Sequence, residues 1–384
     1  QQLAGEDDVV IFQPEFSPDG KYVSYICTQG DWDALKIVDL ASGETRTLYA
    51  PENVHLMEPA WVQGMRSYAW LKDSQSIVFI QYQEGQTTLW NIDLKSQVTS
   101  QIPASPYTYF GQISISLHDE IAMIASAASV PARVVVWNGK NWRIAVRSSS
   151  ESIDPSYLSE PQAVSWLAED QSLVNGLFYP PKNPNFTCEG KPPLIVHIHG
   201  GPTSQAVMVY DPDISYFTSR GYGWLEVNYR GSTGYGHAYE KKLRKNWGNF
   251  DVEDAVQGAR SLVAKGQANE KQIIIMGGSA GGYTVYNCLI RYPGVFKAGV
   301  CLYGVSNLFT LDMDSHKFEA FYNASLIGSL PEAAERYHAW SPVFHAEKIQ
   351  DALAIFHGAE DKAVPPNQAD EIISKLQQKG TPYL

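Results

Sequence analysis

The stretch IIIMGGSAGGYTVYN (Ile273–Asn287) decides how the second half of this chain folds. Its apolar start is typical of a buried strand, and the residues after the glycines favour a helix. Between them, Gly277-Gly278-Ser279-Ala280-Gly281 matches the pattern G-x-S-x-G, in which a serine occupies a sharp strand-to-helix turn. Glycines are needed because side chains two residues before and after the serine would collide there. The pattern predicts that Ser279 is a nucleophile.

Buried strands and amphipathic helices alternate on both sides of this stretch. Strands are predicted in PLIVHIHG (193–200), GWLEVNYRG (223–231), QIIIMGG (272–278), FKAGVCLYG (296–304) and ALAIFHG (352–358). Helices are predicted in DVEDAVQGARSLVAKG (251–266) and in PNQADEIISKLQQKG (366–380), which starts with proline and ends with glycine. The alternation predicts a doubly wound, mostly parallel sheet with helices on both faces.

A glycine-rich loop, HIHGGPTSQ (197–205), comes at the end of an earlier strand. In hydrolases with this serine turn, such a loop supplies one backbone donor to the oxyanion. We predict that the N–H groups of Gly201 and Ala280 are the two oxyanion donors, with the N-terminus of the following helix adding to them. His197 and His199 precede the serine, whereas the base of this fold follows the acid, so both are interpreted as structural.

The acid of the predicted triad is Asp361, in IFHGAEDKAVPPNQA (355–369), because catalytic groups gather where parallel strands end. Glu360 is the rival and is interpreted as solvated. No base is found in the sequence, because all nine histidines precede the acid. His357, four residues before Asp361, is the best of these candidates. The chain starts without methionine and stops in mid-pattern at Leu384. We therefore expect a fragment cut at both ends, inactive as given, with the catalytic histidine beyond Leu384.

Up to about Ser150 the sequence consists of short β-branched and aromatic runs separated by turn residues. SPDGKYVSYI…ALKIVDL (17–40) is echoed about 55 residues later by SQSIVFIQY…TLWNIDL (74–94), and a weaker third copy starts near Gln112. Such repeats are typical of β-propeller blades, and an open β-sandwich is the alternative.

Two domains are predicted from these patterns. Residues 1–165 form a partial β-propeller of about three blades, and residues 166–384 form an α/β-hydrolase domain that lacks its C-terminal end. Three blades do not close a ring, which needs about four or more. This is a second reason to expect a missing N-terminal part.

The composition excludes several classes of function. Hydrophobic residues make up 44% and charged residues 18% of the 384, as in soluble globular proteins. A net charge of −12 without a basic run argues against a nucleic-acid partner, and no run is long enough for a membrane helix. The four cysteines show no metal-ligand spacing and no disulfide framework. We expect no metal, cofactor or membrane partner, and a cytoplasmic location; a homo-oligomer is left open.

Together these motifs resemble the prolyl oligopeptidase family of serine peptidases, in its acylaminoacyl-peptidase and dipeptidyl-aminopeptidase-like branch. HGGPTS, NYRGSTGYGHAY (228–239), WGNFDVEDAVQGARSLV (247–263), GGSAGGYT and HGAEDKAVPPNQA follow the order of the family pattern. The resemblance implies a propeller that screens substrates by size and a hydrolase domain that cleaves short peptides without a metal.

Residue by residue, the resemblance implies that Ser279 is the nucleophile and Asp361 the acid, and that Gly201 and Ala280 are the oxyanion donors. It also implies an apolar substrate pocket, for which ordinary core packing is the alternative. The pocket would be lined by Val305, Leu308 and Val364.

Three features depart from the family pattern. The catalytic histidine is absent, and His199 stands where prolyl oligopeptidases and dipeptidyl peptidases of type IV carry an oxyanion tyrosine. Ala363 stands where the latter carry an asparagine. The last two favour the acylaminoacyl-like branch. We predict a serine peptidase that acts on short peptides through an acyl-enzyme on Ser279; an esterase of the same fold and a non-catalytic propeller-bearing binding protein are the alternatives.

Overall fold

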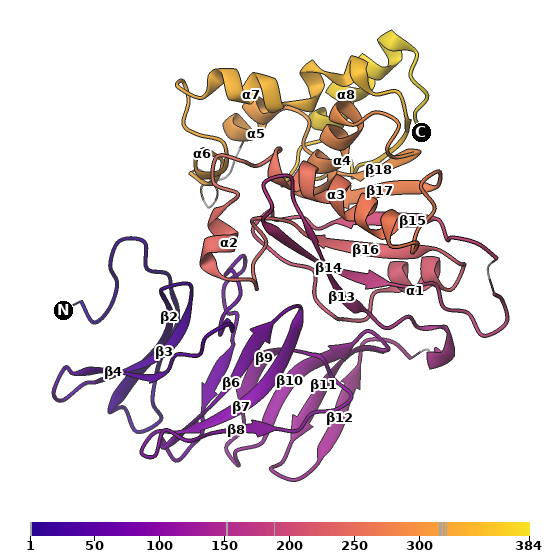
Figure 1. Cartoon of the computed structure of the whole chain (residues 1–384). Coiled ribbons are helices and arrows are strands. Elements are labelled where there is room, and N and C mark those ends of the chain that lie inside the picture. Colours follow the sequence, from indigo (N-terminus) through magenta and orange to yellow (C-terminus); the bar gives the residue numbers. More distant parts are fainter. Residues whose placement is uncertain (1, 151–152, 188, 315–316, 318, 320) are drawn as a thin grey trace. The chain divides into compact units, whose positions relative to one another are not determined.

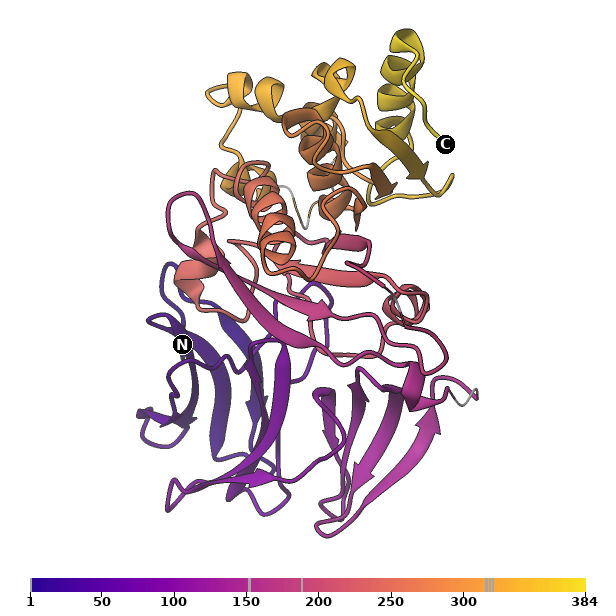
Figure 2. The same ribbon diagram turned by 45° about the vertical axis from the view of Figure 1, so that its right-hand side comes forward.

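The computed structural model describes residues 2–150, 153–187, 189–314, 317, 319 and 321–384 of the chain. They fall into two compact units (Figures 1 and 2). The first unit comprises residues 1–155 with the segments 207–212 and 233–238, and the second comprises residues 156–206, 213–232 and 239–384.

The first unit contains three four-stranded antiparallel sheets, and in each sheet the strands pair in the order of the sequence. The strands are β1 (Ile11–Phe16), β2 (Tyr22–Gln29), β3 (Trp32–Asp39), β4 (Thr45–Tyr49), β5 (Tyr68–Trp70), β6 (Ser76–Gln83), β7 (Gln86–Asp93), β8 (Thr99–Ile102), β9 (Tyr109–Ile115), β10 (Ile121–Ala127), β11 (Val130–Trp137) and β12 (Trp142–Arg147). This repeated up-and-down order is that of propeller blades. The repeat seen in the sequence therefore corresponds to three blades, and not to the two sheets of a β-sandwich.

The middle blade is apolar on both faces. On β6, Ile77 and Phe79 belong to a buried cluster shared with the first blade, whereas Val78 and Ile80 belong to a cluster shared with the third. Successive side chains of a strand point to opposite faces, so a strand that is buried on both sides needs a continuous apolar run. The run from Ile77 to Ile80 supplies it.

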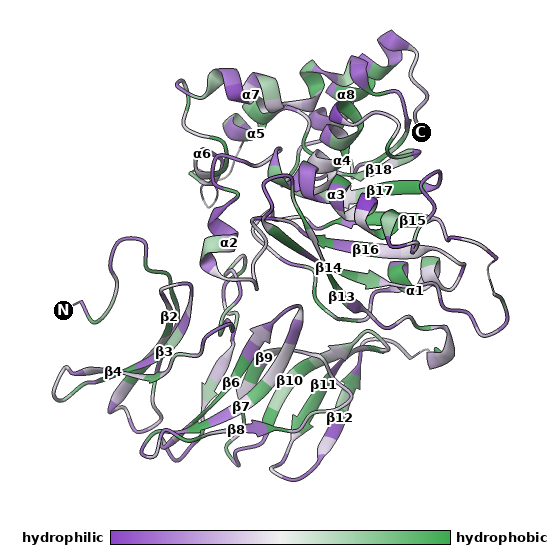
Figure 3. Ribbon diagram, viewed as in Figure 1, coloured by the Kyte–Doolittle hydropathy of each residue, from purple (hydrophilic) through white to green (hydrophobic). Residues whose placement is uncertain are grey.

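The second unit is built on one seven-stranded sheet with the order β13-β14-β16-β15-β17-β18-β19. Its strands are β13 (Gln162–Leu167), β14 (Leu173–Tyr179), β15 (Leu194–Ile198), β16 (Gly223–Asn228), β17 (Ile273–Gly278), β18 (Ala298–Leu302) and β19 (Ala352–Phe356). β13 pairs antiparallel with β14, and β14 pairs antiparallel with β16. The strands β16, β15, β17, β18 and β19 are parallel to one another. Figure 3 shows the hydrophobic character of the central strand β17. The predicted doubly wound, mostly parallel sheet is confirmed.

The helices are α1 (Pro212–Thr218), α2 (His237–Lys241), α3 (Phe250–Ala264), α4 (Ala280–Arg291), α5 (Leu308–Asp314), α6 (Tyr322–Leu326), α7 (Ala334–Trp340) and α8 (Asn367–Lys379), with short 3₁₀ turns at Pro155–Tyr157, Pro342–Phe344 and Ala346–Lys348. The two helices predicted from periodicity correspond to α3 and α8. Within the described part of the chain, no helix combines the length and the apolar character needed to cross a membrane.

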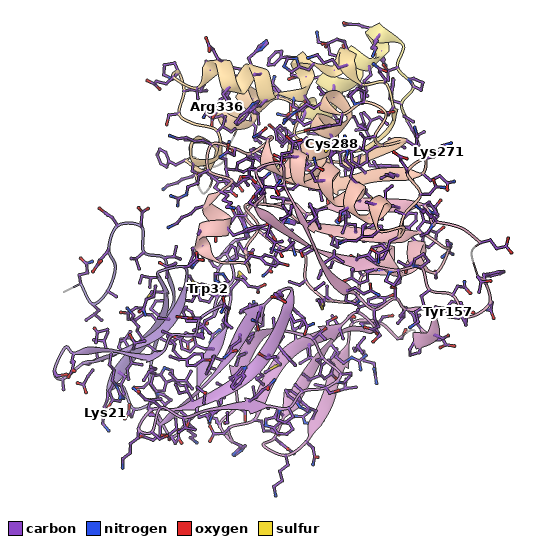
Figure 4. The ribbon with its side chains drawn as sticks, viewed as in Figure 1. Lys21, Trp32, Tyr157, Lys271, Cys288 and Arg336 are labelled. Atoms are coloured by element: carbon purple, nitrogen blue, oxygen red, sulfur yellow. The ribbon has the colours of Figure 1, made fainter. Side chains whose placement is uncertain are left out.

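Helices cover both faces of the sheet. The ring of Trp224 in β16 lies 5.8 Å from that of Phe217 in α1, whereas the next residue, Leu225, lies against Gly258 of α3. Neighbouring residues of a strand point to opposite faces, so α1 and α3 lie on opposite sides. Helix α4 shares the side of α3, because the thiol of its fully buried Cys288, labelled in Figure 4, contacts the α3 backbone.

The boundary between the units lies earlier than the predicted residue 165. That position falls inside β13, which pairs along its whole length with β14 and so belongs to the second unit. The first part of the first unit ends at Pro155, and the unit also includes two short later segments, residues 207–212 and 233–238. The polar composition of the intervening sequence gave no sign of this edge strand.

A buried arginine fixes the loop that follows β16. Arg230 is fully buried, and its guanidinium lies 2.7 Å from Asp254, 2.9 Å from Glu253 and 3.0 Å from Asp170. Its backbone N–H also donates to the Asp254 carboxylate, at 2.7 Å. A buried charge is tolerated only when it is fully paired, so this network ties the end of β16 to α3.

We predict that Gly282→Ala destabilises the second unit, although alanine normally favours a helix. A Cβ at this position of α4 would lie 2.6 Å from the Cα of Gly304 and 2.9 Å from the thiol of Cys301. Overpacking of this kind costs about 1–3 kcal/mol, which exceeds the gain of about 1 kcal/mol from helix propensity. Urea unfolding measures the difference. Gly358→Ala is the control because its Cβ meets nothing within 4 Å; equal stability of the two variants would contradict the packing argument.

Candidate active site

Ser279 lies between β17 and α4 in a strained backbone conformation. Its φ of 55° and ψ of −121° are rare for any residue other than glycine. Its N–H donates to the carbonyl of Leu302 at 3.0 Å, and its own carbonyl accepts the N–H of Tyr283 at 3.1 Å. Within the described residues, the Ser279 hydroxyl has no hydrogen-bond partner. This is the geometry that the motif predicts for a nucleophilic serine.

The glycines around Ser279 are required by close backbone contacts. A Cβ on Gly277 would lie 2.7 Å from the backbone of Gly281 and 2.9 Å from the carbonyl oxygen of Ile198. A Cβ on Gly281 would collide with the same carbonyl. The end of the neighbouring strand β15 therefore excludes side chains at both motif glycines.

The predicted oxyanion donors lie beside the nucleophile. A Cβ on Gly200 would lie 3.5 Å from the Cβ of Ser279, so the loop that carries Gly201 borders the serine. Ala280 is the first residue of α4, where backbone N–H groups lack partners within the helix. In the part of the chain that the structure describes, neither the N–H of Gly201 nor that of Ala280 donates a hydrogen bond. Their action on an oxyanion stays a prediction.

Asp361 lies in the loop after β19, and two backbone groups orient its carboxylate. Its Oδ1 accepts the N–H groups of Ala363 (2.9 Å) and Val364 (3.0 Å). Strand β19 pairs with β18, which pairs with β17, so Asp361 and Ser279 follow the carboxyl ends of parallel strands at the same edge of the sheet. The rival Glu360 is exposed. The position suits an acid, and its catalytic role stays a prediction.

No histidine among the described residues forms a hydrogen bond with Ser279. His357 donates its Nε2–H to the carbonyl of Val364 at 2.8 Å, and the same nitrogen lies 3.9 Å from Oδ2 of Asp361. His316 lies outside the described residues. The described residues thus bring the predicted nucleophile and the predicted acid to one edge of the sheet but do not place a base.

The two histidines of the oxyanion loop have other partners. Nδ1 of His197 lies 2.8 Å from the carboxylate of Glu226. His199 lies 2.8 Å from the carbonyl of Gly200 through Nδ1 and 2.8 Å from the hydroxyl of Ser232 through Nε2. Burial lowers the pKa of His199 to about 4, although the hydrogen bond to Gly200 and the charge of Glu226 act to raise it and His197 lowers it slightly further. His199 is therefore neutral at neutral pH.

The three residues predicted to line a substrate pocket lie in the core of the second unit. They are 3%, 0% and 5% exposed: Val305, Leu308 and Val364. Such burial agrees with the alternative interpretation, in which these residues belong to the ordinary hydrophobic core. A pocket role for them stays a prediction.

One cluster in the first unit has the residue types of a metal site. The ligand atoms of Asp33, His55 and His237 lie within 4.8 Å of one another. The N–H of Gly236 donates to Nε2 of His55 at 3.0 Å, so Nδ1 carries the hydrogen and donates it to Asp33. A metal bound to Nδ1 of neutral His55 would leave the hydrogen on Nε2. This N–H would then face the N–H of Gly236, and two donors cannot form a hydrogen bond with each other. The cluster is therefore a hydrogen-bonded network and does not fit a metal ion.

Two tyrosines that sequence reasoning did not single out hold the oxyanion loop. The Tyr229 hydroxyl donates to the carbonyl of Pro202 at 2.9 Å. The Tyr322 hydroxyl accepts the N–H of Thr203 at 3.0 Å and lies 2.6 Å from its Oγ1. Tyr229 is part of the motif NYRGS, which could have pointed to it. Tyr322 reaches the loop from 119 residues away, and no local pattern reveals it.

A family model described as the prolyl oligopeptidase family matches residues 208–384, which include Ser279, Ala280 and Asp361. Residues 208–384 of the chain thus match the prolyl oligopeptidase family. The predicted resemblance is thus confirmed, and the family's propeller and α/β-hydrolase fold is the one seen here.

Several proteins of known name are similar to this chain. The acylamino-acid-releasing enzyme of Arabidopsis thaliana is 25% identical over 423 residues, which cover 96% of this chain and 54% of that protein. Dipeptidyl peptidase family member 6 of Caenorhabditis elegans is 33% identical over 198 residues, which cover 49% of this chain and 26% of that protein. A solved puromycin-hydrolyzing peptidase of Mycobacterium tuberculosis is 31% identical with a TM-score of 0.94, covering all of this chain and 58% of that one. The chain spans about half the length of several of the curated relatives it matches.

The buried neutral imidazole of His199 predicts how stability depends on pH. Its folded pKa of about 4 lies below the ordinary 6.5, so unfolding takes up a proton between these values. The contribution of this group is complete above pH 6.5 and is lost as the pH falls toward 4. Relative to His199→Asn, the wild-type free energy of unfolding should fall by up to about 1.4 kcal/mol per pH unit in this window.

Urea unfolding of wild type and variant across this range checks the prediction. His118→Asn, at an exposed histidine, is the control and should leave the pH dependence unchanged. Parallel stability curves for wild type and His199→Asn would show that the imidazole is not held neutral.

Proposed function

We propose that this chain carries the catalytic machinery of a serine peptidase that hydrolyses short peptides through an acyl-enzyme on Ser279. The observation that supports it is the strained backbone of Ser279, which lies between an apolar strand and a helix with two unpaired N–H groups beside it. Strain of this kind costs about 1–3 kcal/mol. A binding loop or a simple turn would place glycine there, because glycine adopts the conformation without strain.

The chemistry follows from the positions of these groups. The Ser279 hydroxyl attacks the carbonyl carbon of the scissile amide and gives its proton to a histidine. The carbonyl oxygen becomes negative, and the N–H groups of Gly201 and Ala280 receive it. The histidine then protonates the leaving amine as the C–N bond breaks, which leaves an ester on Ser279. Water hydrolyses this ester by the same route, while Asp361 keeps the histidine in the required tautomer.

We propose that the general base is a histidine that comes after Asp361 in the order of the chain, as the order of catalytic residues in this fold requires. Tyr383 forms a parallel bridge with Leu353 of β19, and the N–H of Leu384 donates to the carbonyl of Leu353 at 3.0 Å. Sequence continuing in this direction would run alongside β19 and reach the edge of the sheet where Asp361 lies. His357 is disfavoured as the base, because its Nε2–H is committed to a backbone carbonyl.

The names of the relatives support small substrates. One is called an acylamino-acid-releasing enzyme, one a dipeptidyl peptidase family member, and one solved neighbour a puromycin-hydrolyzing peptidase. We infer that the substrate is a short peptide or a similar aminoacyl amide, cleaved near its N-terminal end.

Labelling with a fluorophosphonate tests whether Ser279 is an activated nucleophile. We expect the full-length protein to label at Ser279 and to hydrolyse aminoacyl and acylaminoacyl anilides. Ser279→Ala should not label and should lose about 10⁴-fold or more in kcat. Peptide mapping of the adduct by mass spectrometry identifies the labelled residue.

Heat-denatured protein is the control for nonspecific labelling. Absence of labelling in the folded full-length protein would overturn the enzyme assignment in favour of a binding protein. Turnover of short esters without turnover of anilides, peptides or puromycin would replace the peptidase by an esterase.

Substitutions at Asp361 and His357 test which of these two residues takes part in catalysis. We expect Asp361→Asn to lower kcat by about 10³–10⁴-fold, because the histidine would lose its tautomer and orientation. His357→Gln should retain kcat within about threefold, because a side-chain amide can still donate to the Val364 carbonyl. Steady-state kinetics with one anilide measures both. A collapse of kcat in His357→Gln, with the fold intact by circular dichroism, would make His357 the base.

A further inference from the structure

The peptide unit between Gly200 and Gly201 is held by the side chain that precedes it. Nδ1 of His199 lies 2.8 Å from the Gly200 carbonyl oxygen. A carbonyl oxygen only accepts, so Nδ1 carries the hydrogen and donates it. The imidazole is buried and stacks on the ring of Tyr229, with centroids 4.4 Å apart and planes at 17°. The stack fixes the plane of the ring, and a flip within that plane would break the hydrogen bond between Nε2 and Ser232.

The other ring nitrogen is fixed as an acceptor. With the hydrogen on Nδ1, neutral His199 has a lone pair on Nε2, and the hydroxyl of Ser232 donates to it at 2.8 Å. Ser232 is itself fully buried, and its N–H donates to the carbonyl of Tyr229 at 2.8 Å. The loop after β16 thus selects the tautomer of His199 that donates toward Gly200.

The carbonyl of Pro202, two residues further along the loop, is held in a similar way. The hydroxyl of Tyr229 donates to the carbonyl oxygen of Pro202 at 2.9 Å. Tyr229 therefore has three contacts with the loop: its ring stacks on His199, its hydroxyl lies 3.4 Å from Nδ1 of His199, and the same hydroxyl donates to Pro202. The carbonyls of Gly200 and Pro202, the residues on either side of Gly201, are thus held by the residues that directly follow β15 and β16.

Holding these carbonyls has a consequence for the N–H of Gly201. The peptide bond between Gly200 and Gly201 is trans, so its carbonyl and its N–H point in opposite directions. A peptide between two glycines can flip at little steric cost, and Gly201 already has a φ of +121°. The hydrogen bond from His199 removes this freedom, which leaves the N–H directed away from the imidazole.

We propose that His199 is a positioning residue for the oxyanion site: by holding the Gly200 carbonyl, it directs the Gly201 N–H toward the oxygen that becomes negative during attack by Ser279. The proposal rests on the proposed function. It explains why a histidine in this loop is buried beside the nucleophile although it has no free nitrogen. Both nitrogens are engaged, so His199 is excluded as the base.

The test compares variants of the full-length protein by kinetics and inhibitor binding. His199→Ala removes the hydrogen bond, and His199→Asn offers an amide N–H in its place. Tyr229→Phe leaves the hydrogen bond from His199 to Gly200 in place but removes the bond to Pro202 and the 3.4 Å contact between the Tyr229 hydroxyl and Nδ1 of His199. A peptide aldehyde forms an adduct on Ser279 that places its oxygen in the oxyanion site, whereas the matching peptide alcohol forms none. The exposed His118→Asn is the matched control and should behave as wild type.

We expect His199→Ala to lower kcat by about 10²-fold or more, in the range for loss of one oxyanion donor, with KM nearly unchanged. Its affinity for the aldehyde should fall by a similar factor, while its affinity for the alcohol stays constant. His199→Asn should recover part of both losses, and Tyr229→Phe should show a smaller loss of the same pattern. A structural role alone would not separate the aldehyde from the alcohol.

The inference is wrong if the variants keep wild-type kcat and aldehyde affinity, or if aldehyde and alcohol affinities fall together. Should His199→Ala fail to fold, His199→Asn and Tyr229→Phe decide by the same two criteria. Wild-type protein that neither labels with fluorophosphonate nor turns over peptides would instead overturn the proposed function, which separates the two failures.

Discussion

The site depends on one close contact, between the first turn of α4 and the carboxyl end of β15. The carbonyl of Ile198 lies where a Cβ of Gly281 would be, and it also limits Gly277. Backbones can approach this closely only without side chains, so the glycines set the distance between the strand and the helix. The same contact brings the loop after β15 against Ser279. Nucleophile and oxyanion loop are therefore neighbours because two backbones touch.

A second layer of contacts keeps that loop in place. The end of β16 is anchored to α3 by the fully paired Arg230, and two residues further along Ser232 meets His199. Removing any partner of a buried charge leaves another unpaired, at a cost of several kcal/mol, so the anchor is stiff. The orientation of the Gly201 peptide is thus supported through His199 and Ser232 by an ion pair that touches no reacting atom.

Sequence reasoning succeeded where the determinants are local. The strained turn at Ser279 is encoded within five residues, and the middle blade is encoded by the apolar run of β6. It was less informative where partners are distant in sequence. The edge strand β13 belongs to the second unit only because it pairs with β14. The hydrogen bond between Tyr322 and Thr203 joins residues that no sequence motif connects. His199 was interpreted as structural, since sequence order excludes it as a base but does not show which carbonyl its ring would meet.

The arrangement separates two requirements of acyl transfer. The oxyanion donors and the conformation of Ser279 are fixed by contacts within the sheet, its loops and α4, and none of these contacts involves a base. Preorganised donors are effective because they need not reorient as charge develops. If Gly201 and Ala280 act as proposed, the electrostatic part of catalysis needs no contribution from the base, whereas proton transfer from Ser279 needs a group that the described residues do not place beside it.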